Sequence, residues 1–322
     1  MRIVDATETT RLLDYPTLIE AIRAGFAGTV FAPPRQHHAI TRAGASPAML
    51  LLMPAWQESG AGASGSFMGV KLVSVFPDNA THGKPSVNAT YVLMSGETGE
   101  PLATIDGQTL TLWRTAATSA LAASALARAD ASRLTMLGAG AMAPHLIAAH
   151  ASVRPIREVV IWNRTAEASQ GLAARLNRPG LQVTATEDRA GAIGWADIVS
   201  AATLSHHPLI KGAWLKAGTH VDLVGAYAPD MREADDEAIA RATVAVDTRA
   251  GMKESGDIAQ PLASGVLTEA GIAGDLYDIA AGRLKRRSEA EITLFKSVGH
   301  AIEDLAGAVA VWRRLNAPAG AG

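Results

Sequence analysis

Hydrophobic positions in the first third of the chain follow a helical period once and then a strand period. Residues 9–30 predict one amphipathic helix, because apolar side chains recur near helical spacing at Leu12, Leu13, Leu18, Ile22 and Phe26. The two prolines of "APPRQHH" end that pattern. Strand-like runs separated by turn residues then occupy 48–56, 67–76, 86–94 and 101–107. We therefore expect a largely antiparallel sheet with one leading helix.

The pattern changes after a helix of small residues, which is expected at about 109–128. Apolar runs then alternate with helical or loop segments, at 133–137, 158–162, 181–186, 197–202, 219–225 and 243–247. Such alternation predicts an α/β protein with a doubly wound parallel sheet over roughly 130–290. The last segment, 291–315, is expected to be one long amphipathic helix.

Length and charge limit the classes of protein. A chain of 322 residues exceeds the size at which one hydrophobic core usually stops growing, so two domains are expected. We assign one domain to 1–117 plus 295–322 and the other to 118–294. The formal net charge of -2 indicates neither nucleic acid nor an anionic membrane as a partner.

The absence of cysteine excludes disulfides, thiolate metal sites and cysteine nucleophiles. The N-terminal residues lack the apolar segment of a signal peptide, and no window reaches about 18 uncharged apolar residues, so no membrane span is expected. These features fit a cytoplasmic protein. The adjacent pairs His37-His38 and His206-His207 lack the spacing of a helical metal site, and we expect no bound metal.

A phosphate-binding turn is indicated by "RLTMLGAGAMAPHL", in which residues 138–143 read G-x-G-x-x-A after a strand and before a helix. The first glycine allows a tight turn, the second lets backbone approach a pyrophosphate, and the alanine permits close helix packing. The helix N-terminus adds free N–H groups. A plain strand-to-helix turn is the alternative, but the following βα units favour dinucleotide binding.

The end of the next strand concerns the choice of cofactor. NAD sites usually have an acidic residue there to hold the ribose 2′-hydroxyl, but this strand is followed by Asn163, Arg164 and Thr165. Arginine with two small hydrogen-bonding residues can hold a 2′-phosphate, although an asparagine cap beside a solvated arginine is the alternative. We therefore expect NADPH as the preferred cofactor, with NADH as a weaker partner.

Three basic residues are candidates for binding an anionic substrate. Lys71 lies inside an apolar strand, where an ammonium needs a counter-charge or ligand and can also transfer a proton. Its alternative is an edge lysine that reaches water. Arg114 lies early in the small-residue helix, where a fixed guanidinium can clamp a carboxylate. Arg35 follows two prolines. A carboxylate-binding pocket is the hypothesis, although sequence alone does not bring the three together.

Nine segments carry a resemblance to a known family, in the order "APPRQ", "MGVKLVSVFPDN", "GKPSVNATYVLMSGETGEPLATIDG", "LTLWRTAATSALAASALAR", "LGAGAMA", "VVIWNRT", "VGAYAPDMREAD", "ESGDI" and "LFKSVGHAIEDLA". Through them the chain resembles the ornithine cyclodeaminase and μ-crystallin family over nearly its whole length. This resemblance implies a homodimer, a first domain that binds the substrate and forms the subunit interface, and a Rossmann domain for the nicotinamide cofactor.

The resemblance also implies the site residues. Those that match the family's substrate-contacting basic residues are Arg35, Lys71 and Arg114. Those that match its cofactor contacts are Gly138, Gly140, Ala141 and Met142 at the pyrophosphate, Asn163, Arg164 and Thr165 at the adenosine ribose, Ala202 and Thr203 along the cofactor, and Ser297, Val298 and Gly299 near the nicotinamide.

One position indicates the branch of the family. Cyclodeaminases carry an aspartate soon after the glycine of "VGxD", but Tyr227 has that place here and Asp230 comes three residues later. Tyr227 then contacts the substrate or fills the space of the missing aspartate. This departure, together with the expected NADPH, favours relatives that resemble Δ1-pyrroline-2-carboxylate and Δ1-piperideine-2-carboxylate reductases.

We therefore expect NADPH-dependent reduction of a cyclic ketimine carboxylate to L-proline or L-pipecolate, with Lys71 and Arg114 as catalytic residues. The substrate is a small cyclic imino acid. Two alternatives are an ornithine cyclodeaminase and an alanine- or opine-type dehydrogenase of the same family. A third, of another class, is a non-catalytic NADPH-dependent protein that binds a small ligand, as μ-crystallin does.

Overall fold

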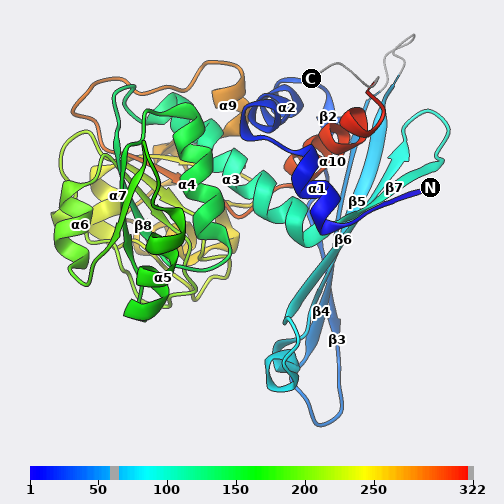
Figure 1. Ribbon diagram of the computed structural model, residues 1–322, viewed down its shortest axis with the longest axis horizontal. Helices are drawn as coiled ribbons and strands as arrows, with labels where there is room; N and C mark the ends of the chain where they lie inside the picture. Colours follow the sequence, from blue (N-terminus) through cyan, green and yellow to red (C-terminus); the bar gives the residue numbers. More distant parts are fainter. Residues whose placement is uncertain (59–64, 318–322) are drawn as a thin grey trace. The chain divides into compact units, whose positions relative to one another are not determined.

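The computed structural model describes residues 1–58 and 65–317, and the chain divides into two compact units (Figure 1). The mixed-sheet unit joins Met1–Arg114 to His300–Gly322, and the parallel-sheet unit is Thr115–Gly299. Helix α3, Gly107–Leu126, begins in the first unit and ends in the second. The C-terminal helix therefore belongs to the same unit as the N-terminus.

The sheet of the mixed-sheet unit has the order β1-β7-β6-β5-β4-β2, and β3 also pairs with β4. Its pairs are antiparallel except for β1 with β7. The strands are β1 Arg2–Val4, β2 Val30–Phe31, β3 Gln36–Ile40, β4 Ala48–Gln57, β5 Phe67–Val75, β6 Val87–Ser95 and β7 Pro101–Asp106. The short turn η1, Pro77–His82, follows β5.

Helices cover one face of this sheet. They are α1 Ala6–Leu12, α2 Tyr15–Ala27 and α10 Ala301–Leu315, and α10 packs on α2 and on β4, β5 and β6. The strands alternate accordingly: on β5 the side chains of Lys71 and Val73 are buried beneath the helices, while Leu72 between them is 37% exposed. Period-2 alternation thus separates a helix-covered face from a second face that no helix within residues 1–58 and 65–317 covers.

The sheet of the parallel-sheet unit has the order β10-β9-β8-β11-β12-β15-β13-β14, and all its pairs are parallel. The strands are β8 Arg133–Leu137, β9 Glu158–Trp162, β10 Gln182–Ala185, β11 Ile198–Ala201, β12 His220–Leu223, β13 Thr243–Val246, β14 Ile272–Gly274 and β15 Thr293–Lys296. The order of the first five strands is that of a dinucleotide-binding doubly wound sheet. The expected fold class is confirmed for both units.

Short helices connect these strands. They are α4 Met142–Val153, α5 Ala166–Leu176, α6 Arg189–Trp195, α7 Asp236–Arg241, α8 Gly256–Ser264 and α9 Leu276–Ala280, with the 3-10 turns η2 Gly212–Trp214, η3 Met252–Glu254 and η4 Glu269–Gly271. The central strands β11 and β12 are buried along their whole length, as expected for strands with helices on both faces.

Two expected helices are wrong in extent. The segment 291–315 is not one helix: Thr293–Lys296 forms β15 between β12 and β13, and only Ala301–Leu315 is helical. Gly299, with φ of 85°, turns the chain between them, and His300 caps α10. Four buried residues are too short a run to distinguish strand from helix by periodicity.

The segment 9–30 is likewise not one helix. α1 ends at Leu12, and Asp14 caps α2 by accepting the Thr17 N–H at 2.9 Å. Pro16 follows in the first turn of α2, where its missing N–H costs nothing. The apolar spacing seemed continuous because both helices pack against α10, and Val30 already belongs to β2.

Candidate active site

The glycine turn lies where the strand order of the parallel sheet reverses. β8 has β9 on one side and β11 on the other, and doubly wound sheets bind ligands at the carboxyl ends of such strands. Gly138 has φ of 105°, and a Cβ on it would lie 2.7 Å from the Ala202 carbonyl oxygen. A Cβ on Gly140 would meet nothing within 4 Å among the described residues. Gly138 is thus required by the turn, whereas Gly140 faces open space that a pyrophosphate can occupy.

The first turn of α4 can meet that pyrophosphate. Its N-cap is Ala141, which is exposed and forms no side-chain cap within the described part of the chain, and Met142 is the first helical residue. N–H groups at such a helix start have no intrahelical partner and carry partial positive charge. The geometry therefore fits an anion at this place.

The residues after β9 are tied to the glycine turn. Asn163 accepts the Ala139 N–H at 3.3 Å and donates to the Thr165 carbonyl at 3.0 Å, so its side chain already has partners. Arg164 and Thr165 are exposed. The strand end thus presents an exposed guanidinium where NAD sites usually present a carboxylate.

A second arginine lies near the same strand end. The guanidinium carbon of Arg189, the first residue of α6, lies 4.8 Å from the ring centre of Trp162 and 5.5 Å from that of Trp214. Cation–π contacts of this kind hold the side chain in place. Arg189 carries no sequence signal, because a lone arginine at a helix start belongs to no motif.

Glu233 joins the two loops that follow β11 and β12. One carboxylate oxygen accepts the N–H and the hydroxyl of Thr203, each at 2.7 Å, and the other accepts the Gly225 N–H at 2.7 Å. A Cβ on Gly225 would lie 2.0 Å from the Thr203 carbonyl oxygen, so only glycine allows this approach. Ala202 continues the ladder of β11 by donating to Leu137 at 3.0 Å. Ala202 and Thr203 therefore lie at the sheet edge, next to the glycine turn.

A buried ion pair supports Glu233. Asp257 accepts the Glu233 N–H at 2.8 Å, and its second oxygen lies 3.1 Å from Lys296 Nζ. Burial raises the pKa of the Glu233 carboxyl, while the ammonium of Lys296 opposes the shift. Asp257 therefore has a structural role, since it holds both the Glu233 backbone and the Lys296 ammonium. Neither Glu233 nor Lys296 stands out in the sequence, because each contacts a residue that lies about 30 or more positions away along the chain.

Ser297, Val298 and Gly299 form the turn that leaves β15. Asp247, at the end of β13, accepts the N–H groups of Val298 and Gly299 at 2.6 and 2.7 Å, and the Ser297 hydroxyl lies 3.3 Å from the same oxygen. This turn is therefore fixed at the same edge of the sheet as the glycine turn. Asp247 is a further residue that the sequence did not single out.

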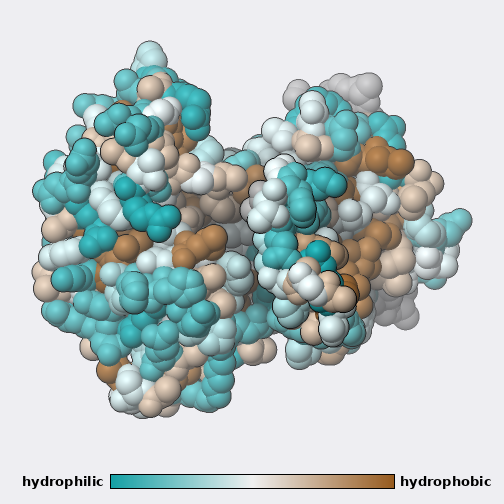
Figure 2. Space-filling model, turned by 90° about the horizontal axis from the view of Figure 1, so that it is seen from below, coloured by the Kyte–Doolittle hydropathy of each residue, from teal (hydrophilic) through white to brown (hydrophobic). Residues whose placement is uncertain are grey.

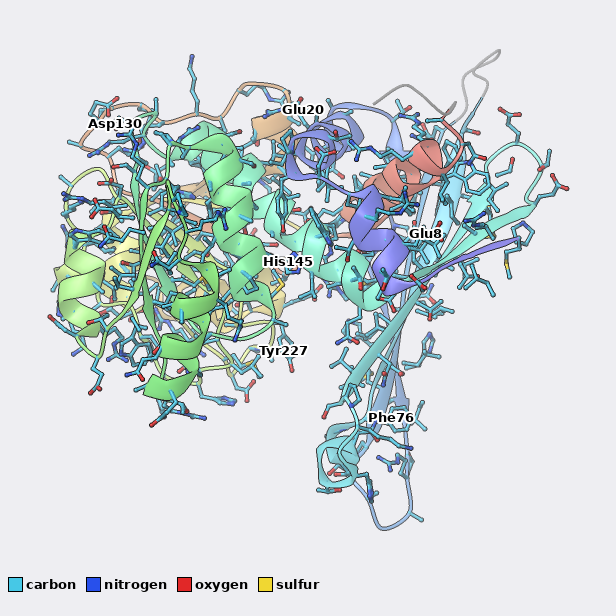
Figure 3. The ribbon with its side chains drawn as sticks, viewed as in Figure 1. Glu8, Glu20, Phe76, Asp130, His145 and Tyr227 are labelled. Carbon is cyan, nitrogen blue, oxygen red and sulfur yellow. The ribbon has the colours of Figure 1, made fainter. Side chains whose placement is uncertain are left out.

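Tyr227 lies in the loop after β12 and is 56% exposed (Figure 3). Asp230, three residues later, pairs with His206, with 3.3 Å between its carboxylate and Nδ1. Asp230 is thus paired with His206 and does not stand at the sequence position of the cyclodeaminase aspartate, which Tyr227 occupies.

Four charged side chains meet beneath α10 in the mixed-sheet unit. Both carboxylate oxygens of Asp304 lie 2.8 Å from Lys71 Nζ. Arg114 Nε lies 3.0 Å from Asp304, and Arg114 Nη1 lies 2.5 Å from Glu303. Lys71 is only 2% exposed, so the alternative of an edge lysine that reaches water is wrong. Burial and the guanidinium of Arg114 lower the pKa of Lys71 to about 8.

A buried tyrosine adjoins this cluster. Tyr91 lies directly across from Lys71 on β6, and its ring covers Gly69, where a Cβ would lie 2.5 Å from the tyrosine hydroxyl. Its hydroxyl has no hydrogen-bond partner among the residues that the structure describes. Burial and the charge of Asp304 raise the pKa of Tyr91 well above its ordinary value. Tyr91 therefore stays a neutral donor.

The structure brings Lys71 and Arg114 together, as the carboxylate-pocket hypothesis requires. Arg35, half-buried, lies directly before β3 in the same unit. Both acidic partners, Glu303 and Asp304, were missed. They lie in α10, and nothing local in the sequence relates the C-terminal helix to β5.

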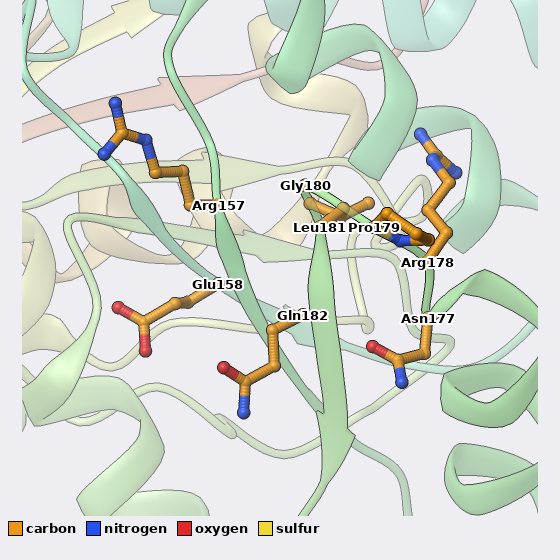
Figure 4. Close-up of a pocket in the computed structure, with 8 residues that line it drawn as sticks. All are labelled: Arg157, Glu158, Asn177, Arg178, Pro179, Gly180, Leu181 and Gln182. Atoms are coloured by element: carbon orange, nitrogen blue, oxygen red, sulfur yellow. The ribbon is translucent and has the colours of Figure 1, made fainter.

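Other features of the surface do not mark the site. A hollow of about 650 Å³ lies at the amino ends of β9 and β10, the wrong edge of a parallel sheet for a cofactor (Figure 4). It is lined by Arg157, Glu158, Asn177, Arg178, Pro179, Gly180, Leu181 and Gln182. In the described part of the chain, no group of three or more histidine or acidic residues could hold a metal ion. No described helix is both long and apolar enough to cross a membrane.

The parallel sheet with its glycine turn, together with the buried lysine and arginine of the other unit, defines the class: an NAD(P)H-dependent oxidoreductase. The chain belongs to the ornithine cyclodeaminase/mu-crystallin family, whose model matches residues 2–318. The expected family is confirmed.

Three relatives place the chain within the family. It is 42% identical to a Delta(1)-pyrroline-2-carboxylate reductase of Paracoccus denitrificans over 74% of this chain and 76% of that one. It is 35% identical to an enzyme of the same name from Colwellia psychrerythraea over 98% and 99%. The solved structure of the Thermococcus litoralis Delta(1)-pyrroline-2-carboxylate reductase, in complex with NADH and L-proline, matches with a TM-score of 0.89 at 32% identity, covering 98% and 97%.

Proposed function

We propose that this protein reduces a cyclic ketimine carboxylate, Δ1-pyrroline-2-carboxylate or Δ1-piperideine-2-carboxylate, to L-proline or L-pipecolate with NADPH. The observation that carries the proposal is the similarity to the Delta(1)-pyrroline-2-carboxylate reductase of Colwellia psychrerythraea, which extends over 98% of this chain. The buried pair of Lys71 and Arg114 supports it, because the substrate bears a carboxylate beside the reacting carbon.

The two units have different tasks in this proposal. The parallel-sheet unit holds the cofactor, with its pyrophosphate against Gly138, Gly140 and the first turn of α4. The cofactor, when bound, supplies the hydride. The turn of residues 297–299 lies along the nicotinamide end. The mixed-sheet unit binds the substrate through Arg114, Lys71 and Arg35.

The chain's own residues handle charge and proton. Arg114 holds the carboxylate, which fixes the C=N carbon for attack; a distance of about 3–3.5 Å between reacting atoms is the usual requirement. Lys71 gives its proton to the ring nitrogen, because the iminium accepts hydride better than the neutral imine. Water then returns the proton to Lys71, and the product leaves as the cyclic amino acid.

The test is oxidation of NADPH with each imine or 2-oxo acid substrate, together with release of ammonia and proline from ornithine, a conversion that leaves the cofactor unchanged overall. We expect turnover with Δ1-pyrroline-2-carboxylate and Δ1-piperideine-2-carboxylate, and little with pyruvate plus amines or with ornithine plus NAD⁺. Turnover with ornithine alone would make the protein a cyclodeaminase, and turnover with pyruvate plus amines an alanine- or opine-type dehydrogenase. Tight NADPH binding without turnover on any substrate would favour a ligand-binding protein.

We propose NADPH rather than NADH because Arg164 is exposed after β9, where no carboxylate opposes a 2′-phosphate. Arg164→Ala should raise the KM for NADPH at least about tenfold, the size of one lost charge-assisted contact, and leave the KM for NADH unchanged. Equal effects on both cofactors would contradict this preference.

We also propose a homodimer formed through the face of the mixed sheet that none of the described helices covers. On this face Trp56 and Leu72 are 38% and 37% exposed, and Pro54, Val70 and Val92 stand beside them in register. Figure 2 shows apolar residues on the surface of this unit. A continuous apolar face is typical of a subunit interface. Light scattering should give twice the chain mass, and Leu72→Lys should give the monomer; a monomeric wild type would refute the proposal.

A further inference from the structure

We propose that Asp304 is a positioning residue for the reaction: it sets the ammonium of Lys71 against the guanidinium of Arg114 and keeps that ammonium charged until it gives up its proton. This inference rests on the proposed function. It adds a residue of the C-terminal helix to a site otherwise built from β5 and α3.

Geometry singles out Asp304. Lys71 and Arg114 belong to different elements and carry like charges, which repel when they are brought together. Asp304 contacts both, at 2.8 Å from Lys71 Nζ and at 3.0 Å from Arg114 Nε. Its side chain is fully buried, and α10 packs on β4, β5 and β6. A single carboxylate on a fixed helix therefore holds the two cations in one arrangement.

Glu303 has a different part. It lies 2.5 Å from Arg114 Nη1 and is likewise fully buried. The two carboxylates together balance the two cations, so the cluster is neutral as a whole. The cyclic imine brings a carboxylate of its own, and the proton that Lys71 passes to the ring nitrogen balances that carboxylate as the iminium forms.

The groups that face Lys71 decide how readily it loses its proton. They are Tyr91 from β6, Arg114 from α3, and Glu303 and Asp304 from α10, while Met53 on β4 is apolar. Burial and Arg114 lower the pKa of Lys71 to about 8; Asp304 opposes them by its charge and hydrogen bond, and Glu303 opposes them less. Without the charge of Asp304, Lys71 loses its proton at lower pH.

The experiment is the pH profile of kcat/KM for imine reduction in the full-length protein. Wild type should lose activity above about pH 8, where Lys71 deprotonates. In Asp304→Asn this alkaline limb should move down by about one pH unit or more, the usual effect of removing an opposite charge in contact. Activity should recover in part at lower pH, and Asp304→Glu should return the limb towards pH 8. An unmoved limb in Asp304→Asn overturns the proposal.

Two matched variants separate this role from a structural one. Glu303→Gln also removes a buried carboxylate of α10 but should move the limb less, because Glu303 acts mainly on Arg114. Asp14→Ala removes the N-cap of α2 and the ion pair of that cap residue with Arg314 on α10. It should lower Tm without moving the limb. A limb that moves equally in all three variants would assign Asp304 a structural role only.

A measurement without substrate distinguishes this inference from the proposed function. The charge state of Lys71 can be followed on the folded chain through the pH dependence of its side-chain nitrogen chemical shift by NMR, which needs no reagent to reach the buried ammonium. The midpoint of this titration should occur at lower pH in Asp304→Asn than in wild type; the same midpoint in both overturns the inference. The expected shift of the midpoint in a protein that reduces no cyclic imine would refute the proposed function alone.

Discussion

Replacing Lys71 with methionine tests the buried cluster most directly. Methionine is nearly as long as lysine and suits a buried position, but it removes the ammonium and its proton. The change leaves Asp304 with Arg114 Nε, 3.0 Å away, as its remaining described ion-pair partner. Both the free energy of unfolding and kcat should change, and a second substitution at Asp304 distinguishes the two effects.

The stability effect follows from the unbalanced charge. Breaking a buried ion pair by removing one partner costs about 3–5 kcal/mol. Because Arg114 still contacts Asp304, we expect the lower end, about 3 kcal/mol, for Lys71→Met. Adding Asp304→Asn removes the surplus charge, and replacing both partners of a buried pair is often neutral. The double variant should therefore regain most of the lost stability.

The catalytic effect should not be regained. A positioned proton donor contributes about 10²- to 10⁴-fold to the rate, so kcat should fall by that factor in Lys71→Met and in the double variant alike. The Kd for NADPH should stay within about twofold of wild type, because Lys71 lies outside the unit that carries the glycine turn.

The assays are urea unfolding, NADPH titration by fluorescence, and imine-dependent NADPH oxidation. Lys253→Met is the matched control, because Lys253 is a surface lysine of the other unit, paired only with Glu269 among the described residues. It should change none of the three. If Lys71→Met keeps more than about a tenth of the wild-type kcat, or if activity returns with stability in the double variant, Lys71 has no part in the chemistry.

Three further predictions concern the parallel-sheet unit. Gly138→Ala should weaken NADPH binding at least about tenfold, because φ is 105° and a Cβ would lie 2.7 Å from Ala202; an unchanged Kd in the titration would refute this. Gly225→Ala should lower the free energy of unfolding by more than about 2 kcal/mol, since its Cβ would overlap the Thr203 backbone, and urea midpoints measure the loss. Burial lowers the pKa of His220 to about 3, so between about pH 6.5 and pH 3 this histidine is protonated in the unfolded chain but not in the folded chain. The free energy of unfolding should therefore fall by about 1.4 kcal/mol for each pH unit below 6.5 because of this group. His220→Asn should flatten that slope, and an unchanged slope would contradict the low pKa of His220.

Local chemistry determined much of the fold. The alternation of apolar runs with helical segments specified a parallel sheet, and the glycine motif marked the strand at which the order reverses. Lys71 was recognisable because an ammonium inside an apolar strand demands a partner. These signals are local, since strand period, turn geometry and the cost of burying a charge all act within a few residues.

Tertiary structure decided which residues meet. The counter-charge of Lys71 is Asp304, more than two hundred positions away, and the anchor of the Thr203 and Gly225 loops is Glu233. Residues 293–296 form a strand rather than part of a helix because they pair with β12 on one side and with β13 on the other. Such outcomes depend on long-range packing, which a local pattern does not encode. The sequence by itself therefore determined the kinds of element and the need for an ion pair, and the packed fold selected its partners.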